Sequence, residues 1–236
     1  MPSVNIYRVK EMFYSLQGEG AQSGRASVFC RFSKCNLWTG REQDRADAVC
    51  NFCDTDFVGT DGQNGGTFDT PQQLAAAIQS LWDLGRHEAG GDPSKEGSNR
   101  IKPYVIFTGG EPLLQLNEAL ISEVHLLGFE VGVETNGTRP APKGIDWLCV
   151  SPKADADVVL KQCDEIKLVF PQPLAPPERF NNIEARHYFL SPMADHSVIA
   201  GRDEKKASNM RLATSYCLAH PQWRLTLQMH KILGID

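Results

Sequence analysis

Short runs of apolar residues recur along the chain and predict a series of buried strands. A run of this kind, bounded by polar and turn-forming residues, is typical of a strand that is covered on both faces of a sheet. The predicted strands are Val28–Phe32, Tyr104–Phe107, Glu130–Val133, Trp147–Val150, Ile166–Phe170, Tyr188–Leu190 and Arg224–Leu227.

Helical patterns separate some of these strands. The clearest begins after Thr70, where Pro71 occupies the first turn and its missing N–H is harmless. Helices are predicted over Gln72–Leu84, Asn117–Leu127 and Asp203–His220. Strands that alternate with helices form a parallel sheet with right-handed crossovers. Because segments such as Arg139–Ile145 are too short for a good helix, we expect an α/β fold that is an incomplete, helix-poor (β/α) barrel with parallel strands.

Composition adds the expected domain organisation. The 236 residues are 41% hydrophobic and 22% charged, which is typical of a globular protein. α/β barrels commonly reach this length undivided, so we expect a single domain over residues 1–236. The most linker-like stretch, Arg86–Lys102, is polar and Gly-rich and is predicted to be a surface loop. Four prolines between Pro171 and Pro177 exclude a helix interior there.

Charge and hydropathy exclude several classes of function. A formal net charge of −5 argues against tight binding of nucleic acid, which requires clustered Lys and Arg. The sequence has no apolar run long enough for a membrane span, and its N-terminus has no signal-peptide pattern. We therefore expect a cytoplasmic protein whose thiols stay reduced. Its seven cysteines then need an explanation other than disulfides.

Three of the cysteines are clustered in one loop. Cys35, Cys50 and Cys53 form a C-x14-C-x2-C pattern directly after the strand Val28–Phe32, within an enlarged loop over residues 33–57. The C-x2-C pair alone fits a redox dithiol or half a zinc site. No histidine precedes residue 87 to complete a local zinc site, and three thiolates without a fourth ligand suit a [4Fe–4S] cluster with one open iron. The remaining cysteines are predicted to be small buried hydrophobic residues, namely Cys30, Cys149, Cys163 and Cys217.

A glycine pair ends the strand that begins at Tyr104. Gly109 and Gly110 precede Glu111 and Pro112 at a strand end, which is where ligands bind in parallel α/β folds. Two glycines there allow the backbone to approach a ligand closely. Taken alone, this segment predicts no more than a tight turn.

Together, the three-cysteine loop and the Gly-Gly-Glu-Pro segment resemble the radical S-adenosylmethionine (SAM) superfamily. The usual cysteine spacing of that superfamily is C-x3-C-x2-C, and this chain has eleven more residues between its first two cysteines. The C-x14-C-x2-C variant resembles the 7-carboxy-7-deazaguanine synthase family. The motifs extend from Leu16 to the C-terminal tail, so the resemblance covers nearly the whole chain.

The resemblance implies three cofactors and their ligands. A [4Fe–4S] cluster is expected on Cys35, Cys50 and Cys53, and Mg²⁺ on the hydroxyl of Thr55. Magnesium takes few protein ligands and completes its shell with water and substrate, so a single threonine is plausible. The residues that the resemblance assigns to SAM are Phe52, Asp54, Gly110, Ser151, Pro152, Lys153 and Ser191.

The implied substrate site combines two distant parts of the chain. Gln17 and Glu19 offer an amide and a carboxylate, which suit the 2-amino-4-oxo edge of a pterin, and a guanidinium at Arg31 suits a carboxylate. The residues assigned to substrate are Leu16, Gln17, Gly18, Glu19, Arg31, Thr108 and, through its terminal carboxylate, Asp236. The tail carries Ile232, Leu233 and Ile235, which favours docking over fraying.

The reaction implied by the resemblance is the conversion of 6-carboxy-5,6,7,8-tetrahydropterin into 7-carboxy-7-deazaguanine with loss of ammonia, a step of queuosine biosynthesis. The cluster and SAM supply the radical, so the family pattern names no protein side chain as catalytic. The resemblance also implies an external reductant such as a flavodoxin, and a homodimer.

Two alternatives remain open from the residues alone. The first is an activase that generates a glycyl radical on a partner protein, although such enzymes usually have the short cysteine spacing. The second is a zinc-binding structural module that uses the three clustered cysteines with Cys30 or a distant histidine.

Overall fold

The structure, a computed structural model, describes residues 6–91, 102–195, 198 and 203–235. The predicted loop Arg86–Lys102 lies partly outside the described residues, and Asp236 lies wholly outside them. The strands are β1 (Tyr7–Leu16), β2 (Ala26–Phe32), β3 (Gly66–Phe68), β4 (Tyr104–Gly109), β5 (Glu130–Thr135), β6 (Trp147–Val150), β7 (Gln162–Phe170), β8 (Glu184–Pro192) and β9 (Trp223–Leu225). The helices are α1 (Pro71–Glu88), α2 (Glu118–Leu126), α3 (Glu204–Ala219) and α4 (Met229–Leu233), with 3₁₀ turns at Glu42–Asp47, Pro112–Leu114 and Pro177–Phe180.

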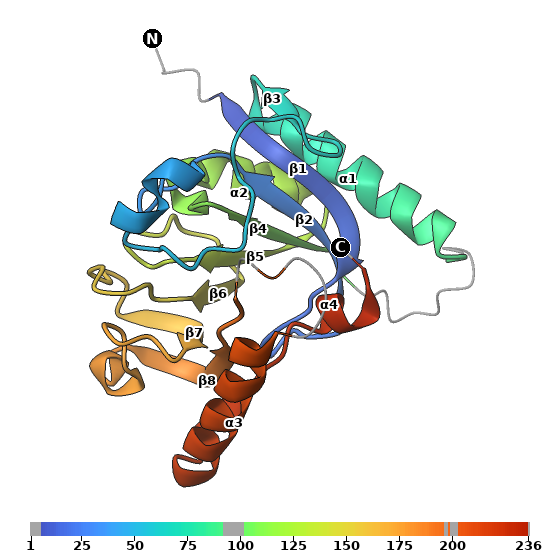
Figure 1. Ribbon diagram of the computed structural model, residues 1–236. Coiled ribbons are helices and arrows are strands. Elements are labelled where there is room, and N and C mark those ends of the chain that lie inside the picture. The colour runs from blue at the N-terminus through green and yellow to red at the C-terminus, as the bar shows by residue number, and fades with distance from the viewer. Residues whose placement is uncertain (1–5, 92–101, 196–197, 199–202, 236) are drawn as a thin grey trace.

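The described strands form one nine-stranded sheet in the order β3-β1-β2-β4-β5-β6-β7-β8-β9. β1 pairs antiparallel with β2 and β3, and every pair from β2–β4 to β8–β9 is parallel. Figure 1 shows this sheet curling into a part-barrel that does not close. The predicted incomplete, helix-poor α/β barrel is confirmed.

The outer face of the sheet carries the larger hydrophobic core. Val28 and Phe107 are fully buried there and belong to one cluster with Ile78 of α1 and Leu120 of α2. Burial of each such side chain stabilises the fold by about 1.5–3 kcal/mol. Because apolar residues cover the outer face, the alternate residues of the same strands are left to face the interior.

The register of the parallel strands decides which side chains meet inside the barrel. Residues paired across neighbouring strands point to the same face of a sheet. Glu134 of β5 pairs with Cys149 of β6, which pairs with Glu165 of β7, which in turn pairs with His187 of β8. The interior therefore carries a row of polar and titratable groups across four strands.

The predicted helices are confirmed with their ends displaced by a few residues. Thr70 accepts a hydrogen bond from the Gln73 N–H and caps α1, with Pro71 in the first turn. Asn117 and Asp203 cap α2 and α3 in the same way. The segment 139–145 forms no helix, as predicted.

Three elements were not predicted, namely β1, β3 and α4. Residues 13–16, for which no strand was predicted, form the end of β1. The register of β1 against β2 shifts between Val9 and Glu11. A bulge of this kind breaks the two-residue alternation of apolar and polar side chains, so the pattern Val9-Lys10-Glu11-Met12 does not indicate a strand.

Two further expectations meet mixed outcomes. Cys30 and Cys149 are buried as predicted. Cys163 and Cys217 are only partly buried, beside a second, smaller hydrophobic cluster that includes Ile166 and Trp223. Within the described segments, none of the helices has the length and apolar character that crossing a membrane requires.

Candidate active site

A cavity of about 480 Å³ lies at the carboxyl ends of the parallel strands. It is bounded by the ends of β4 to β8 and by the loop that carries the clustered cysteines. The predicted site residues that line it are Leu16, Gln17, Gly18, Glu19, Arg31, Cys35, Cys50, Phe52, Cys53, Asp54, Thr55, Thr108, Gly110, Ser151, Lys153 and Ser191. Pro152 does not line it, and its carbonyl instead accepts a hydrogen bond from Gln172. The fold thus gathers segments more than 170 residues apart around one space.

Arg45 holds the shape of the cysteine loop. Its guanidinium donates to the main-chain carbonyl of Cys53 (2.9 Å) and to that of Asn51 (3.1 Å). The same group lies over the Trp38 ring, 4.2 Å from its centroid. A loop this long without a sheet partner needs such cross-links to keep Cys50 and Cys53 in a fixed arrangement.

The three thiols are suited to metal-bound thiolates. Cys50 donates a hydrogen bond to Cys53, and this lowers the pKa of Cys53 to about 6 in spite of burial. That hydrogen bond and burial raise the pKa of Cys50, and burial raises the pKa of Cys35. The Lys153 ammonium lies close enough to favour the thiolates of Cys50 and Cys53. One thiolate forms readily, and the others would ionise when a cation replaces their protons.

The three thiols suit an iron–sulfur cluster in their number and in their position around one cavity. Among the described residues, no three His, Cys, Asp or Glu side chains converge on one point as a mononuclear site requires. In a [4Fe–4S] cluster each cysteine binds its own iron, so the sulfur atoms stand apart around the cluster. Cys35, Cys50 and Cys53 all line the cavity, so a cluster bound there would take one thiolate on each of three irons.

The glycine pair has a packing role that the sequence did not indicate. A Cβ at Gly109, whose φ is +143°, would overlap the main chain of Phe32, and one at Gly110 would overlap the Lys34 carbonyl and the Cys35 Cβ. The pair therefore lets the end of β4 pack against the start of the cysteine loop. Only glycine at position 110 leaves Cys35 where it is.

Glu111 joins the ends of β4 and β5. Its buried carboxylate accepts hydrogen bonds from the Thr135 hydroxyl (2.7 Å), the Asn136 N–H (2.8 Å) and the Leu113 N–H (2.9 Å). Burial raises the pKa of Glu111 although these donors favour its charged form. The glutamate of the Gly-Gly-Glu-Pro segment is thus a structural link that fixes two strand ends at the cavity.

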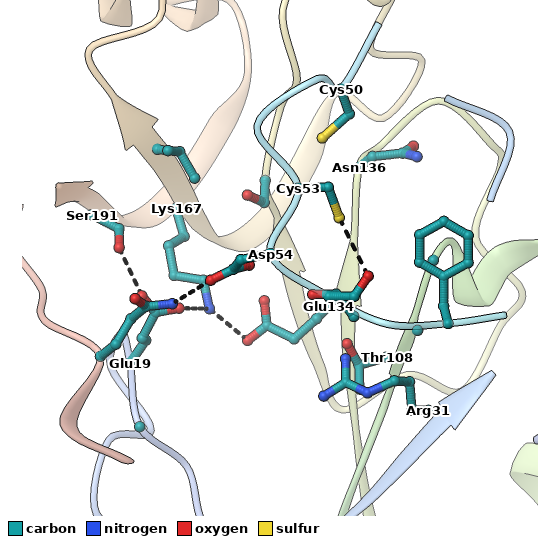
Figure 2. Close-up of a pocket in the computed structure, with 18 of the residues that line it drawn as sticks. Glu19, Arg31, Cys50, Cys53, Asp54, Thr108, Glu134, Asn136, Lys167 and Ser191 are labelled. Carbon is teal, nitrogen blue, oxygen red and sulfur yellow. Dashed lines mark hydrogen bonds and ion pairs between the residues drawn. The ribbon is translucent and has the colours of Figure 1, made fainter. Parts of the chain in front are cut away.

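A buried ion network forms part of the cavity wall. The Lys167 ammonium lies between Glu134 (2.9 Å) and Glu19 (3.1 Å), and the Ser191 hydroxyl donates to Glu19 (2.7 Å), as Figure 2 shows. Gln17 donates to the same Glu134 oxygen at 3.1 Å. The network therefore fixes both Gln17 and Glu19, the two residues expected to recognise a pterin edge.

The charges in this network are mutually dependent. Burial opposes the charge on Glu19, but Lys167 and the Ser191 hydroxyl hold its pKa below the usual value. Burial likewise opposes the charge on Lys167, yet Glu134 and Glu19 raise its pKa well above the usual value. Glu19 and Lys167 are therefore both ionised at neutral pH, and neither would be stable as an isolated buried charge.

Arg31 lies on the cavity wall beside Thr108, its register partner on β4 (Figure 2). Its Nε donates to Glu11 at 2.7 Å, which fixes the plane of the guanidinium. A guanidinium held by one edge is prepared to bind an anion with the other.

The C-terminal segment closes one side of the cavity. The Met229 N–H donates to the Gly18 carbonyl (3.0 Å), and Lys231 forms an ion pair with Asp54 (2.6 Å). Partial desolvation beside the cavity acts to raise the pKa of Asp54, but the ion pair with Lys231 keeps it below its usual value. The tail is docked as predicted, but polar groups hold it, because Ile232 and Leu233 are 68% and 55% exposed.

Proteins of one enzyme family match this chain over nearly its whole length. No family model matches the chain. The 7-carboxy-7-deazaguanine synthase of Bordetella pertussis is 56% identical over 97% of this chain and 99% of its own length. That of Caulobacter vibrioides is 55% identical over the same shares.

The chain belongs to the 7-carboxy-7-deazaguanine synthase family. It is thus a member of an enzyme family, which decides against the glycyl-radical activase and the zinc module. The crystal structure of QueE from Escherichia coli matches the fold with a TM-score of 0.61 over 95% of each chain, at 23% identity. That likeness supports the barrel architecture.

Sequence reasoning missed several residues of this synthase-family cavity, namely Glu11, Lys167 and His230. A signal for Lys167 existed, because a lysine stands between Ile166 and Leu168 in a strand predicted to be buried. Such a charge is retained only with a partner. Glu11 gave no signal because the strand that carries it was not recognised.

Proposed function

We propose that this chain catalyses the radical conversion of 6-carboxy-5,6,7,8-tetrahydropterin into 7-carboxy-7-deazaguanine with loss of ammonia. One observation carries the proposal: the cysteine loop and the Gln17–Glu19 recognition groups line the same cavity of about 480 Å³. Membership of the 7-carboxy-7-deazaguanine synthase family supports the product. The cavity would hold the cofactors and the pterin side by side.

The cofactors of this proposal are a [4Fe–4S] cluster, SAM and Mg²⁺. When bound, the cluster and SAM supply a carbon radical that removes a hydrogen atom from the substrate. Cys35, Cys50 and Cys53 would hold the cluster, and the Thr55 hydroxyl would bind Mg²⁺ at the cavity wall. The residues proposed to hold SAM are Phe52, Asp54, Gly110, Ser151, Pro152, Lys153 and Ser191.

Two of these SAM residues already have partners that limit how they can act. The Asp54 carboxylate is paired with Lys231, so its main chain is the part that remains for SAM. Lys153 donates to both the carbonyl and the hydroxyl of Ser151, each at 2.6 Å, and thereby orients that hydroxyl.

The substrate would be held at both ends. Gln17 and Glu19 would bind the amino-oxo edge of the pterin, with Leu16, Gly18 and Thr108 around it. Arg31 would bind the substrate carboxylate through the guanidinium edge that Glu11 leaves open. The terminal carboxylate of Asp236 completes the proposed site.

We also propose the cellular setting that the family pattern implies. The chain would act as a single domain over residues 1–236, as a homodimer in the cytoplasm, with an electron donor such as a flavodoxin. The part-barrel of one continuous sheet supports the single domain.

The test is anaerobic turnover. The protein, reconstituted with iron and sulfide, is incubated with SAM, dithionite and 6-carboxy-5,6,7,8-tetrahydropterin, and the product is detected by mass. We expect 7-carboxy-7-deazaguanine and released ammonia, with a higher substrate KM in Arg31→Lys, which keeps the charge but not the planar fork. An iron-replete protein that cleaves SAM but forms no deazaguanine would overturn the proposal.

A further inference from the structure

Glu165 is a buried carboxylate that the proposed function does not use. It is 2% exposed, lies on the inner face of β7 two residues before Lys167, and does not line the cavity. Because the cavity lies at the carboxyl ends of the strands, Glu165 is one layer deeper in the barrel than Lys167. A carboxylate at such a depth needs partners that explain its presence.

Glu165 contacts the segment Gln17–Ala21, which carries the proposed substrate-recognition residues, and it also contacts Cys149 of β6. One carboxylate oxygen accepts the Ala21 N–H at 2.8 Å, and the other accepts the Cys149 thiol at 3.6 Å. Gly20 has φ +73°, and a Cβ there would overlap the Glu165 carboxylate. The Gly20 N–H donates to the Thr226 hydroxyl at 2.9 Å. The turn after Glu19 thus packs closely against Glu165. Hydrogen bonds from two successive N–H groups, those of Gly20 and Ala21, fix its position.

This clamp determines where Glu19 lies. Glu19 is two residues from Ala21, so its position relative to Lys167 and Ser191 depends on the turn that Glu165 holds. We propose that Glu165 is a positioning residue for substrate binding, whose carboxylate fixes the segment Gln17–Ala21 so that Gln17 and Glu19 face the pterin. This inference rests on the proposed function and adds a residue to the same site.

The surroundings explain why this role needs the charged form. Burial, together with the Glu134 carboxylate of β5, raises the pKa of Glu165 to about 7, and Lys167 limits the rise. Cys149 of β6, His187 of β8 and Tyr104 of β4 also face it. An ionised carboxylate binds an N–H more strongly than a neutral group does, so the hold on Ala21 weakens as pH falls through about 7.

The test compares Glu165→Gln with Glu184→Gln, an exposed carboxylate on the neighbouring strand β8. We expect Glu165→Gln to raise the KM for the carboxytetrahydropterin about tenfold, as loss of one charge-assisted hydrogen bond does, with iron content unchanged. Its melting temperature at pH 8 should equal or exceed that of the parent. The parent should lose kcat/KM on acidification through about pH 7, and the variant should not. An unchanged KM, or a fall in melting temperature parallel to the rise in KM, would refute the positioning role.

A second measurement is independent of turnover. Hydrogen exchange of the amides of residues 18–21 at pH 8 should be faster in Glu165→Gln than in the parent and unchanged in Glu184→Gln. Equal exchange in Glu165→Gln and the parent would overturn the inference. If the parent forms no deazaguanine, the proposed function fails, while the exchange result still decides whether Glu165 fixes the segment.

Discussion

At the scale of single residues, the cavity is a place where charge is buried at a cost in stability. Lys167 forms ion pairs with two carboxylates, whereas Glu165 forms none with the cations of the described residues. Buried ion networks rarely increase stability over apolar packing, so their presence at a strand end marks a site of function. The polar inner face and the apolar outer face belong to the same strands. Residues that serve function therefore alternate along each strand with residues that pack in the core.

The cluster assignment predicts the effect of removing one thiol. Cys50→Ala should abolish cluster assembly while the chain stays folded, because only three clustered thiolates are available. Cys217→Ala, at a partly buried position on α3, should leave the iron content unchanged. Iron analysis and the visible absorption spectrum after anaerobic reconstitution measure both. A full iron complement in Cys50→Ala would remove this residue from the ligand set.

Glu165 predicts an unusual dependence of stability on pH. Because its pKa is raised from 4.5 to about 7, the folded chain holds a proton that the unfolded chain has released between these values. The free energy of unfolding therefore falls as pH rises through this window, by about 3 kcal/mol at most from this group. Glu165→Gln should flatten that slope in urea titrations at pH 5 and pH 8. A slope identical to that of the parent would assign the pH dependence to other groups.

At the scale of elements, the site depends on how strand ends and loops pack against one another. β4 approaches the cysteine loop closely because Gly109 and Gly110 lack side chains. Glu111 then fixes the end of β5, and α4 lies near the end of β1 (Figure 1), where the Met229 N–H donates to the Gly18 carbonyl. Each contact links a motif that looks local in sequence to a distant segment.

The close packing at Gly110 predicts a specific loss. Gly110→Ala should displace Lys34 and Cys35 and lower the iron content several-fold, because a Cβ overlaps main-chain atoms that cannot move aside cheaply. Gly66→Ala on β3 is the matched control, since its Cβ would meet ordinary contacts near Phe68. Both variants are compared by iron content and circular dichroism. Normal iron in Gly110→Ala would show that the loop adapts.

The docked tail predicts an effect on substrate binding. Deletion of residues 229–236 removes the contacts of α4 with Gly18 and Asp54, and with them the proposed carboxylate of Asp236. The substrate KM should rise by at least tenfold, since each charged hydrogen bond contributes about 1.5–3 kcal/mol. Lys231→Gln alone should change the unfolding free energy by less than about 1 kcal/mol, because the pair with Asp54 is exposed. A truncated enzyme with parental substrate kinetics would contradict this.

At the scale of the whole molecule, the two faces of the curved sheet separate stability from function. The outer face and its helices supply most of the apolar burial, and the inner face supplies the polar groups of the cavity. A parallel sheet opens its strand ends to one side, which leaves room for a ligand without breaking the core.

This separation predicts that core variants change stability alone. Leu120→Ala on α2, where the side chain is fully buried, should lower the free energy of unfolding by about 2–5 kcal/mol. The substrate KM at 20 °C should stay within a factor of about two, because no wall of the cavity is formed by α2. A large change in KM would mean that the outer core controls the cavity directly.

The sequence by itself determined the fold class, the main helices and the residues of the cavity that lie in local motifs. Apolar runs and helix caps act over a few residues, so they can be recognised from the sequence alone. The cysteine spacing and the Gly-Gly-Glu-Pro segment are local for the same reason. β1 was not predicted because its bulge disturbs the alternation of apolar and polar residues by which a strand is recognised.

Only the tertiary structure decided which residues meet. The pairings of Lys167 with Glu19, of Glu165 with Ala21 and of Asp54 with Lys231 join segments more than 140 residues apart. Strand register and loop packing bring such groups together, and neither leaves a local pattern in the sequence. For Lys167 and Glu19 the cost of burying an unpaired charge then fixes the partner, because each is stable in the interior only where the fold supplies the other.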